Sequence, residues 1–597
     1  MEKLKNREDM NSEFQWDLKD TYASDTEWEE SYEKTLIRMN GFSKYKGNLS
    51  NNNGETLLEA LIELSELFKN SLRLYVYANL KHYQDTQNQI YNDLQIRAHK
   101  IYTNVYTISS FADPEILEIG YEKVNIFIES NKGLALYKHD LENLFRKAQH
   151  TLSADREKIL AEMSSFTNLP SKIYTIINNA EAKFKPAIDK HGNEVEVTHG
   201  QYSKIMEGED RVLRESFHNS YLDYFCERKD SIAGLYSGLV NQNNFFAKTR
   251  NYSSSLEMHL YSNNIPTSVY ENLITSVTEN AQVLNRYTNI RKKALGVDVL
   301  KPYDLLASMV PDVDYKVTYE EAKEIIIKAL APMGEEYVNI VKTILNSKWI
   351  DVYENKNKRS GAFSWGTYGT PPYIMMSFKD DLYSLFTLAH ELGHSVHSHY
   401  SRTTQPFVYS NYSIFIAEVA STAHEVLLMD YLLKTTTDKK LRKYLLNYKI
   451  KDFVSTFFRQ TMFAEFELEA HRLEENKKII NSETLSDMYK GILEKYLGKD
   501  LELDDKIIYE WARIPHFYTS YYVYQYATDY AAAMAISKSI IENKEGAVNS
   551  FTELLKSGSS DYPIPLLKKA GVDMTTSKPI EDALSVFSDL LDEFEKE

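Results

Sequence analysis

Two histidines and a glutamate in the segment TLAHELGHSVHSHY, residues 387–400, have a spacing that suits metal chemistry. His390 and His394 stand one helical turn apart, so both imidazoles can reach a single metal ion. Glu391 can reach a water on that metal without being a ligand. Zinc would lower the pKa of this water toward ~7, and the carboxylate would take its proton during attack on a carbonyl. The same carboxylate could then protonate a leaving amine, so the motif predicts hydrolysis of an amide bond.

A third ligand is needed, because so short a motif can also occur by chance. His397 is one candidate, but on a straight helix it lies ~10.5 Å along the axis from His390, so three rings cannot converge on one ion. The zinc pattern H-E-x-x-H-x-x-G-x-x-H is also absent, because the chain has His397 and Tyr400 where glycine and histidine are required. We therefore expect His397 and His399 to be cleft-wall or helix-surface residues.

The better candidate for the third ligand is Glu418, on a second predicted helix that covers residues 413–433. If this helix packs against the first, Glu418 completes the two-histidine, one-glutamate set of catalytic zinc sites. Gly393 favours such packing, because a residue without a side chain lets another element approach closely. Glu425 lies two turns further, too far for the same ion. It is predicted either to support a histidine from outside the metal shell or to form a surface salt bridge.

The elements that must position these residues are mostly helices. Apolar residues recur at helical spacing over residues 382–400, and residues 14–180 read as successive amphipathic helices. Residues 184–202 predict a small hairpin, and we place a boundary there between an N-terminal helical lobe, residues 1–195, and a catalytic domain, residues 196–597. Residues 359–378 predict a strand after a glycine-rich approach, which either binds substrate backbone or is an ordinary loop.

Composition narrows the class of protein. The 597 residues are 43% hydrophobic and 26% charged, with only 21 glycines and 14 prolines, which favours a mainly helical globular protein. Cys226 is the single cysteine, so an internal disulfide framework is excluded and a reducing compartment, the cytoplasm, is expected. We find no secretory signal and no apolar run long enough to span a membrane. The net charge of −17 makes nucleic acid an unexpected partner.

Several longer stretches carry a family resemblance. "HELGH" followed by "FIAEVAST", together with "RSGAFSWGTYGTPPYI", "IPHFYTSYYVYQYA" and "SDYPIPLLKKAGVDM", resembles the thimet-oligopeptidase-like (M3) zinc metallopeptidases, and within them the oligoendopeptidase F branch. The likeness runs from the N-terminal helices to the C-terminus. It implies a mainly α, two-lobed zincin-type fold with a deep channel between helical lobes and only small β elements. It also implies one Zn²⁺ per chain and endopeptidase cleavage of short peptides.

The resemblance also implies roles for single residues. His390, His394 and Glu418 would hold zinc, and Glu391 would be the general base and then the general acid. His516 would stabilise the oxyanion, because a single zinc usually receives help from side-chain donors. Tyrosines of the same segment would contact substrate, and the register allows three of them: Tyr518, Tyr521 and Tyr524. For any one of these tyrosines the alternative is an aromatic residue of the core.

Two other functions fit the same motifs. One is an exopeptidase on the same scaffold, either a carboxypeptidase or a peptidyl-dipeptidase, which would need a charged group to hold the free terminus of a peptide. The sequence does not identify such a group. The other is a catalytically silent peptide-binding protein, and Glu391 stands against it, because structural zinc needs no general base. No sequence feature defines an oligomeric state.

Overall fold

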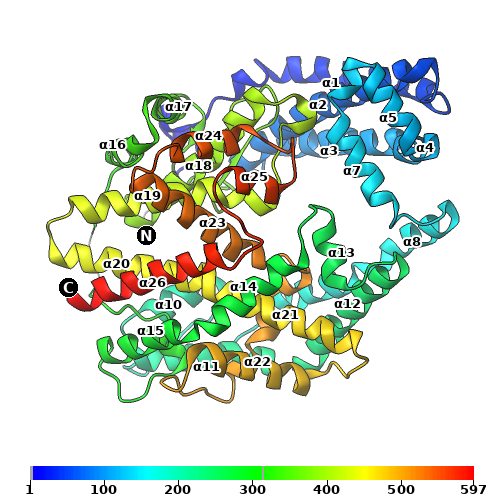
Figure 1. The fold of residues 1–597 in the computed structure, drawn as a ribbon. Helices are drawn as coiled ribbons and strands as arrows, with labels where there is room; N and C mark the ends of the chain where they lie inside the picture. The colour runs from blue at the N-terminus through cyan, green and yellow to red at the C-terminus, as the bar shows by residue number, and fades with distance from the viewer. Residues whose placement is uncertain (1–3, 312, 314) are drawn as a thin grey trace. The chain divides into compact units, whose positions relative to one another are not determined.

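The structure is a computed structural model that describes residues 4–311, 313 and 315–597. Helices dominate the described residues, and strands occur only as short segments in two small sheets (Figure 1). The mainly α fold with small β elements is therefore confirmed. Among the described residues, none of the helices combines the length and the apolar character needed to cross a membrane.

The chain divides into two compact units, each built from three separate segments. The first unit comprises Met1–Gln149, Tyr315–Tyr431 and Ile536–Gly571. The second comprises His150–Asp314, Leu432–Ala535 and Val572–Glu597. Compact units defined by contacts need not coincide with domains in sequence, so the boundary at residues 195 and 196 stays a prediction, as does the channel between lobes.

The helices of the first unit come from all three of its segments. They are α1 (Asp25–Asn40), α2 (Glu55–Gln84), α3 (Gln89–Ser109), α4 (Ala112–Ile119), α5 (Tyr121–Ser130), α6 (Lys132–Ala135), α7 (Lys138–Ala148), α16 (Tyr319–Ala329), α17 (Glu335–Asn346), α18 (Leu382–Thr404), α24 (Ala547–Lys556) and α25 (Pro563–Lys569). Two helices continue from one unit into the other: α19 (Ala417–Thr435) and α23 (Tyr524–Ile541).

The second unit is helical apart from one hairpin. Its helices are α8 (Ala154–Thr167), α9 (Leu169–Thr175), α10 (Tyr202–Glu207), α11 (Arg211–Cys226), α12 (Lys229–Thr249), α13 (Ser255–Tyr261), α14 (Thr267–Glu279), α15 (Ala281–Ala294), α20 (Lys439–Phe453), α21 (Arg459–Glu475), α22 (Ser482–Leu497) and α26 (Lys578–Lys596). The predicted hairpin is present as β1 (Ala187–Ile188) and β2 (Glu194–Val195), which pair antiparallel.

A three-stranded sheet in the first unit separates the N-terminal helices from α18. Strand β5 (Tyr373–Met375) is central, with β3 (Ile350–Asp351) parallel on one side and β4 (Phe363–Trp365) antiparallel on the other. Tyr373 and Met375 belong to the hydrophobic core of the N-terminal helices. Side chains alternate along a strand, so Ser364 of β4 faces the opposite way, and its hydroxyl lies 2.8 Å from that of Ser395 on α18.

The two helices predicted to carry the site are present with small shifts in their bounds. Asp381 caps α18 by accepting a hydrogen bond of 2.7 Å from the Ser384 amide. The helix runs to Thr404, one turn beyond the predicted end at residue 400. Helix α19 begins at Ala417, after a 3₁₀ turn at Ile414–Ile416, so Glu418 lies in its first turn. Glu418 therefore lies near the N-terminus of α19, beside the histidines of α18.

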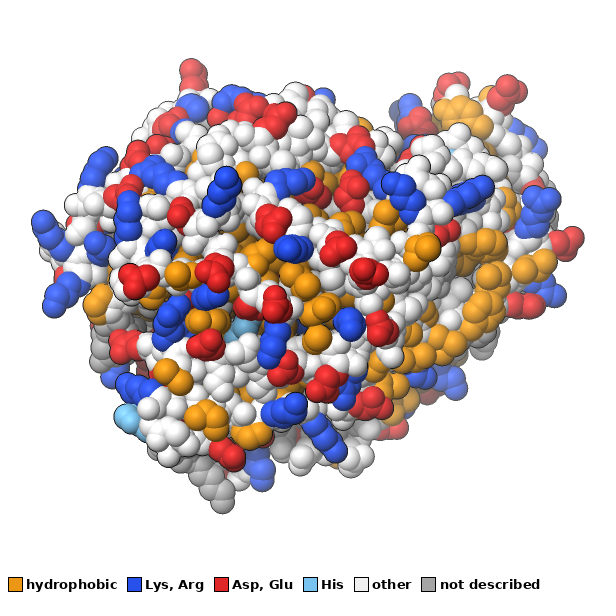
Figure 2. All heavy atoms as spheres, turned by 90° about the horizontal axis from the view of Figure 1, so that it is seen from below, with side chains coloured by type: hydrophobic (Ala, Val, Ile, Leu, Met, Phe, Trp, Pro, Cys, Tyr) orange, Lys and Arg blue, Asp and Glu red, His pale blue; other side chains and the backbone are white. Residues whose placement is uncertain are grey.

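The surface charge is mixed on the face drawn in Figure 2. Lysine and arginine side chains alternate there with aspartate and glutamate, with no continuous basic stripe on that face. Interspersed charges of both signs are typical of a solvated protein surface. That nucleic acid is not a partner stays a prediction.

Candidate metal centre

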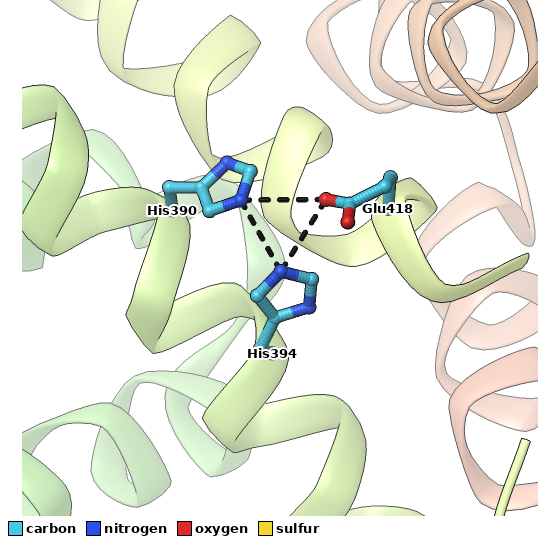
Figure 3. Close-up of side chains that lie close together, drawn as sticks. All are labelled: His390, His394 and Glu418. Atoms are coloured by element: carbon cyan, nitrogen blue, oxygen red, sulfur yellow. Dashed lines mark hydrogen bonds and ion pairs between the residues drawn. The ribbon is translucent and has the colours of Figure 1, made fainter. Parts of the chain in front are cut away.

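Three ligand atoms of the predicted triad converge on one point (Figure 3). The Nε2 atoms of His390 and His394 are 3.2 Å apart, and each lies 3.3 Å from Oε2 of Glu418. Tetrahedral zinc with bonds of about 2.0–2.1 Å places its ligand atoms roughly 3.3 Å from one another. The three distances therefore fit a group of ligands around one metal ion.

Gly393 is the residue that allows the two helices to come together. A Cβ atom at this position would lie 2.5 Å from Cα of Ser421 and 2.6 Å from the carbonyl oxygen of Ala420. These are backbone atoms of α19, which cannot move aside as a flexible side chain can. Contact between α18 and α19 at Gly393 brings Glu418 within reach of the histidines.

Gly393→Ala is expected to push α19 away from α18 and to weaken both folding and zinc binding. Overpacking of this kind costs about 1–3 kcal/mol, although alanine is intrinsically the better helix former. Denaturant unfolding and zinc titration against a chelator measure the two effects. Gly234→Ala in α12 is the matched control, because open space surrounds Gly234 and the change should be neutral or stabilising. Equal stability of both variants would contradict the role of Gly393.

Glu425 lies outside the triad and contacts the first histidine. Its Oε1 is 2.6 Å from Nδ1 of His390. A carboxylate accepts hydrogen bonds, so Nδ1 of His390 donates to Glu425, and Nε2 is the ring nitrogen that faces the other two residues of the triad. This arrangement orients the imidazole for metal binding.

His424 is a buried residue at the site that the sequence reasoning missed. Its Nδ1 lies 3.0 Å from the carbonyl oxygen of Ala389, so this nitrogen donates, and Nε2 then accepts from the Tyr337 hydroxyl at 2.7 Å. The bond ties α19 to the backbone of α18 immediately before His390. The only sequence signal for His424 was its position about one and a half turns after Glu418. Its partner Tyr337 belongs to α17, which is far from α19 in the sequence.

Glu391, the predicted general base, is buried next to His390 on α18. Its side chain is 5% exposed, Oε2 has no hydrogen-bond partner among the described residues, and the Ser364 backbone amide donates to the carboxylate. Burial raises the pKa of Glu391, and the Glu418 carboxylate raises it further, against the lowering effect of His390 and His394. A raised pKa brings the carboxylate closer to the range in which a base transfers protons near neutral pH.

The pKa values of His390 and Glu418 are shifted in opposite directions by their contact. Burial lowers the pKa of His390, but the carboxylates of Glu418 and Glu425 outweigh burial, so the net shift is well upward. Burial raises the pKa of Glu418, but the two histidines outweigh it and the net shift is downward. Glu418 is thus an anion at any physiological pH, as a metal-ligating carboxylate must be.

The two other histidines of α18 lie outside the triad. His397 is buried, with 1% of its surface exposed, rather than on the helix surface, and its ring stacks on Tyr412 at 3.5 Å between centroids. Burial lowers its pKa to about 3, and neither ring nitrogen has a hydrogen-bond partner among the described residues. His399 is half-buried, and burial lowers its pKa as well.

The predicted substrate-contacting segment belongs to the second unit, where accessibility differs from residue to residue. His516 is exposed and Tyr518 half-buried. Tyr521 and Tyr524 are buried, with only 3% and 2% of their surface exposed, so their role as substrate contacts stays a prediction. Tyr526 is half-buried and packs against His516 at 6.4 Å between ring centroids. Buried and accessible tyrosines follow one another in this irregular segment without a regular spacing. The sequence therefore does not tell which tyrosines are buried.

Comparison with known proteins identifies the family of the chain. The family model described as Peptidase family M3 matches residues 204–586, and the model described as Oligopeptidase F matches residues 115–184. The chain is 42% identical to Oligopeptidase PepF of Bacillus subtilis over 99% of this chain and 88% of that protein. It is 37% identical to Group B oligopeptidase PepB of Streptococcus agalactiae over 99% of this chain and 98% of that protein.

A solved structure shows the same fold. Oligoendopeptidase-F from Enterococcus faecium superposes with a TM-score of 0.75 at 35% sequence identity, over 96% of this chain and 99% of that chain. The chain belongs to peptidase family M3, in its oligoendopeptidase F branch, and is a metallopeptidase. The family resemblance expected from the sequence motifs is therefore confirmed.

Proposed function

We propose that this protein is a zinc-dependent endopeptidase that hydrolyses internal bonds of short peptides. The observation that carries the proposal is the set of three ligand atoms 3.2–3.3 Å apart, next to a buried glutamate that has an unpartnered oxygen. The donor set of two imidazole nitrogens and one carboxylate oxygen is typical of catalytic zinc. Short peptides are proposed as substrates because the relatives are oligopeptidases by name.

The roles of the residues follow from their chemistry. His390, His394 and Glu418 would hold one zinc ion per chain, and Glu425 would orient His390. Zinc, when bound, supplies Lewis acidity that acidifies water and polarises the carbonyl of a peptide bond. Glu391 takes the proton of the attacking water on its free oxygen and passes it to the departing amine nitrogen.

Donors to the oxyanion are proposed from the segment of residues 514–527. The family resemblance assigns this role to His516 and to a tyrosine of its segment, of which Tyr518 is the accessible one among those predicted. Partial burial lowers the pKa of His516, which keeps the imidazole neutral and able to donate one hydrogen bond.

The cytoplasmic location of the protein also stays a prediction.

An end-blocked, internally quenched peptide tests the proposal. Wild type should cut it at an internal bond, lose activity to a chelator and regain it with zinc, and mass spectrometry should locate the bond. Reconstitution with cobalt or manganese in parallel tests the identity of the metal. Trimming of unblocked peptides alone would favour the exopeptidase, and tight binding without products would favour the silent peptide-binding protein.

A further inference from the structure

Arg402, on the last turn of α18, has no anionic partner among the residues that the structure describes. It is half-buried, its Nη1 is fully buried, and within the described part of the chain that nitrogen has no hydrogen-bond partner. Burial lowers the pKa of Arg402, and only the phenol of Tyr412 opposes this effect. Buried arginines are normally paired with carboxylates, because an uncompensated buried charge is costly. An unpaired one at this place therefore points to an anion that comes from outside the chain.

The surroundings of Arg402 connect it to the catalytic residues of the same unit. Tyr412 lies close enough to Arg402, Glu418 and Glu391 for each of these charges to affect the pKa of its phenol. The Tyr412 hydroxyl is held 3.0 Å from that of Ser398, one helical turn before Arg402. Tyr412 is thus near both Arg402 and the residues of the metal site.

The chain at β4 passes close to both Glu391 and Arg402, and it gives the approximate distance between them. The backbone amide of Ser364 in β4 donates to Glu391, and a Cβ atom on Gly366, the first residue after β4, would lie 2.9 Å from Nη1 of Arg402. Two residues of extended strand cover about 7 Å. A peptide that lies extended along β4, with its cleaved bond at Glu391, therefore brings a group about two residues away next to Arg402.

We propose that Arg402 is a carboxylate-binding subsite of this peptidase, which pairs with a carboxylate of the bound peptide about two residues from the cleaved bond. The carboxylate is that of an acidic side chain or the free C-terminus, and a guanidinium recognises both in the same bidentate way. The inference rests on the proposed endopeptidase function and adds a charge preference to it. It also names a charged group that the sequence alone did not identify.

Matched peptides test the proposal in two arms. In the first arm, glutamate or glutamine occupies each position in turn of an end-blocked, internally quenched peptide. In the second arm, a peptide with neutral side chains carries a free or an amidated C-terminus. For each enzyme the ratio of kcat/KM for the carboxylate peptide to that for its amide counterpart is measured, so that changes in overall activity cancel.

Wild type should prefer the carboxylate about tenfold at one position, and Arg402→Gln should reduce that ratio to within about twofold of unity. Arg402→Lys should retain part of the preference, because it keeps the charge but loses the bidentate geometry. Lys34→Gln is the matched control: it removes a positive charge from a side chain of the same unit that is 78% exposed, and it should keep the wild-type ratio. Arg402→Met is the second neutral variant should Arg402→Gln not fold.

The outcomes separate this inference from the proposed function. A preference seen in the first arm identifies an acidic side chain as the ligand, and one confined to the second arm identifies the C-terminal carboxylate. Neutral peptides cut normally, with no carboxylate preference in wild type or an undiminished one in Arg402→Gln, would overturn the inference alone. If no peptide is cut, the proposed function fails. Calorimetric binding of the same peptides then decides the inference, which falls if Arg402→Gln binds carboxylate and amide peptides as wild type does.

Discussion

Glu391→Gln should bind zinc as wild type does and lose nearly all turnover of an end-blocked peptide. The amide keeps the size of the carboxylate but cannot take a proton from the attacking water. General base catalysis contributes roughly a hundredfold to ten-thousandfold, so a loss of about a thousandfold in kcat is expected. Metal content by mass spectrometry and steady-state kinetics on the quenched peptide measure the two quantities separately.

The buried position of Glu391 means that this substitution changes proton transfer and little else. Its carboxylate is held by the Ser364 amide, and glutamine can accept the same hydrogen bond through its side-chain oxygen, so the local structure should persist. The loss should fall on kcat rather than KM, since proton transfer occurs only in the transition state. Wild-type turnover in this variant would show that Glu391 is not the general base. Loss of the metal would show that Glu391 supports the metal site instead.

Glu418→Gln should abolish stable zinc binding, with an affinity at least about a hundredfold lower than that of wild type. Loss of a residue that only supports a ligand already weakens metal affinity 10–100-fold, and loss of an anionic ligand should exceed this. Competition with a chromophoric chelator measures the affinity. Activity should fall in parallel and recover in part at high zinc concentration.

His397→Phe is the control that decides between the two candidates for the third ligand. The ring of His397 stacks on Tyr412 and has no polar partner among the described residues, so a phenyl ring can take its place. This variant should keep its zinc. Loss of zinc from His397→Phe together with retention in Glu418→Gln would show that the histidine, not the glutamate, is the third ligand.

Local pattern was enough for those parts of the site that depend on one helix. The four-residue spacing of His390 and His394 places their imidazoles on one side of α18 whatever the rest of the chain does. The same periodicity predicted the helix over residues 382–400, and the end moved only to Thr404 because the terminal turn has no strong stop signal. The two-histidine motif and the helical class were thus readable without tertiary contacts.

The segment predicted to contact substrate shows what local pattern does not contain. Tyr521 adopts a left-handed backbone conformation, with a φ of 55°, and its amide donates to the buried carboxylate of Glu467 on α21 at 2.7 Å. This contact between segments 54 residues apart turns the Tyr521 side chain into the core. A non-glycine residue with positive φ is uncommon and is not predictable from helical periodicity.

Local sequence patterns predicted the helical class and the family, and they singled out His390, His394 and Glu418 as a candidate metal triad, because spacing along a helix and short motifs are local properties. Tertiary structure decided which distant groups meet these residues. Packing between segments sets the contact of the α19 backbone with Gly393, the bond of Glu425 to His390 and the bond of His424 to Ala389. It also leaves Nη1 of Arg402 without a hydrogen-bond partner in the described part of the chain. Burial and pairing depend on the positions of all neighbours in space, and no local pattern of residues contains that information.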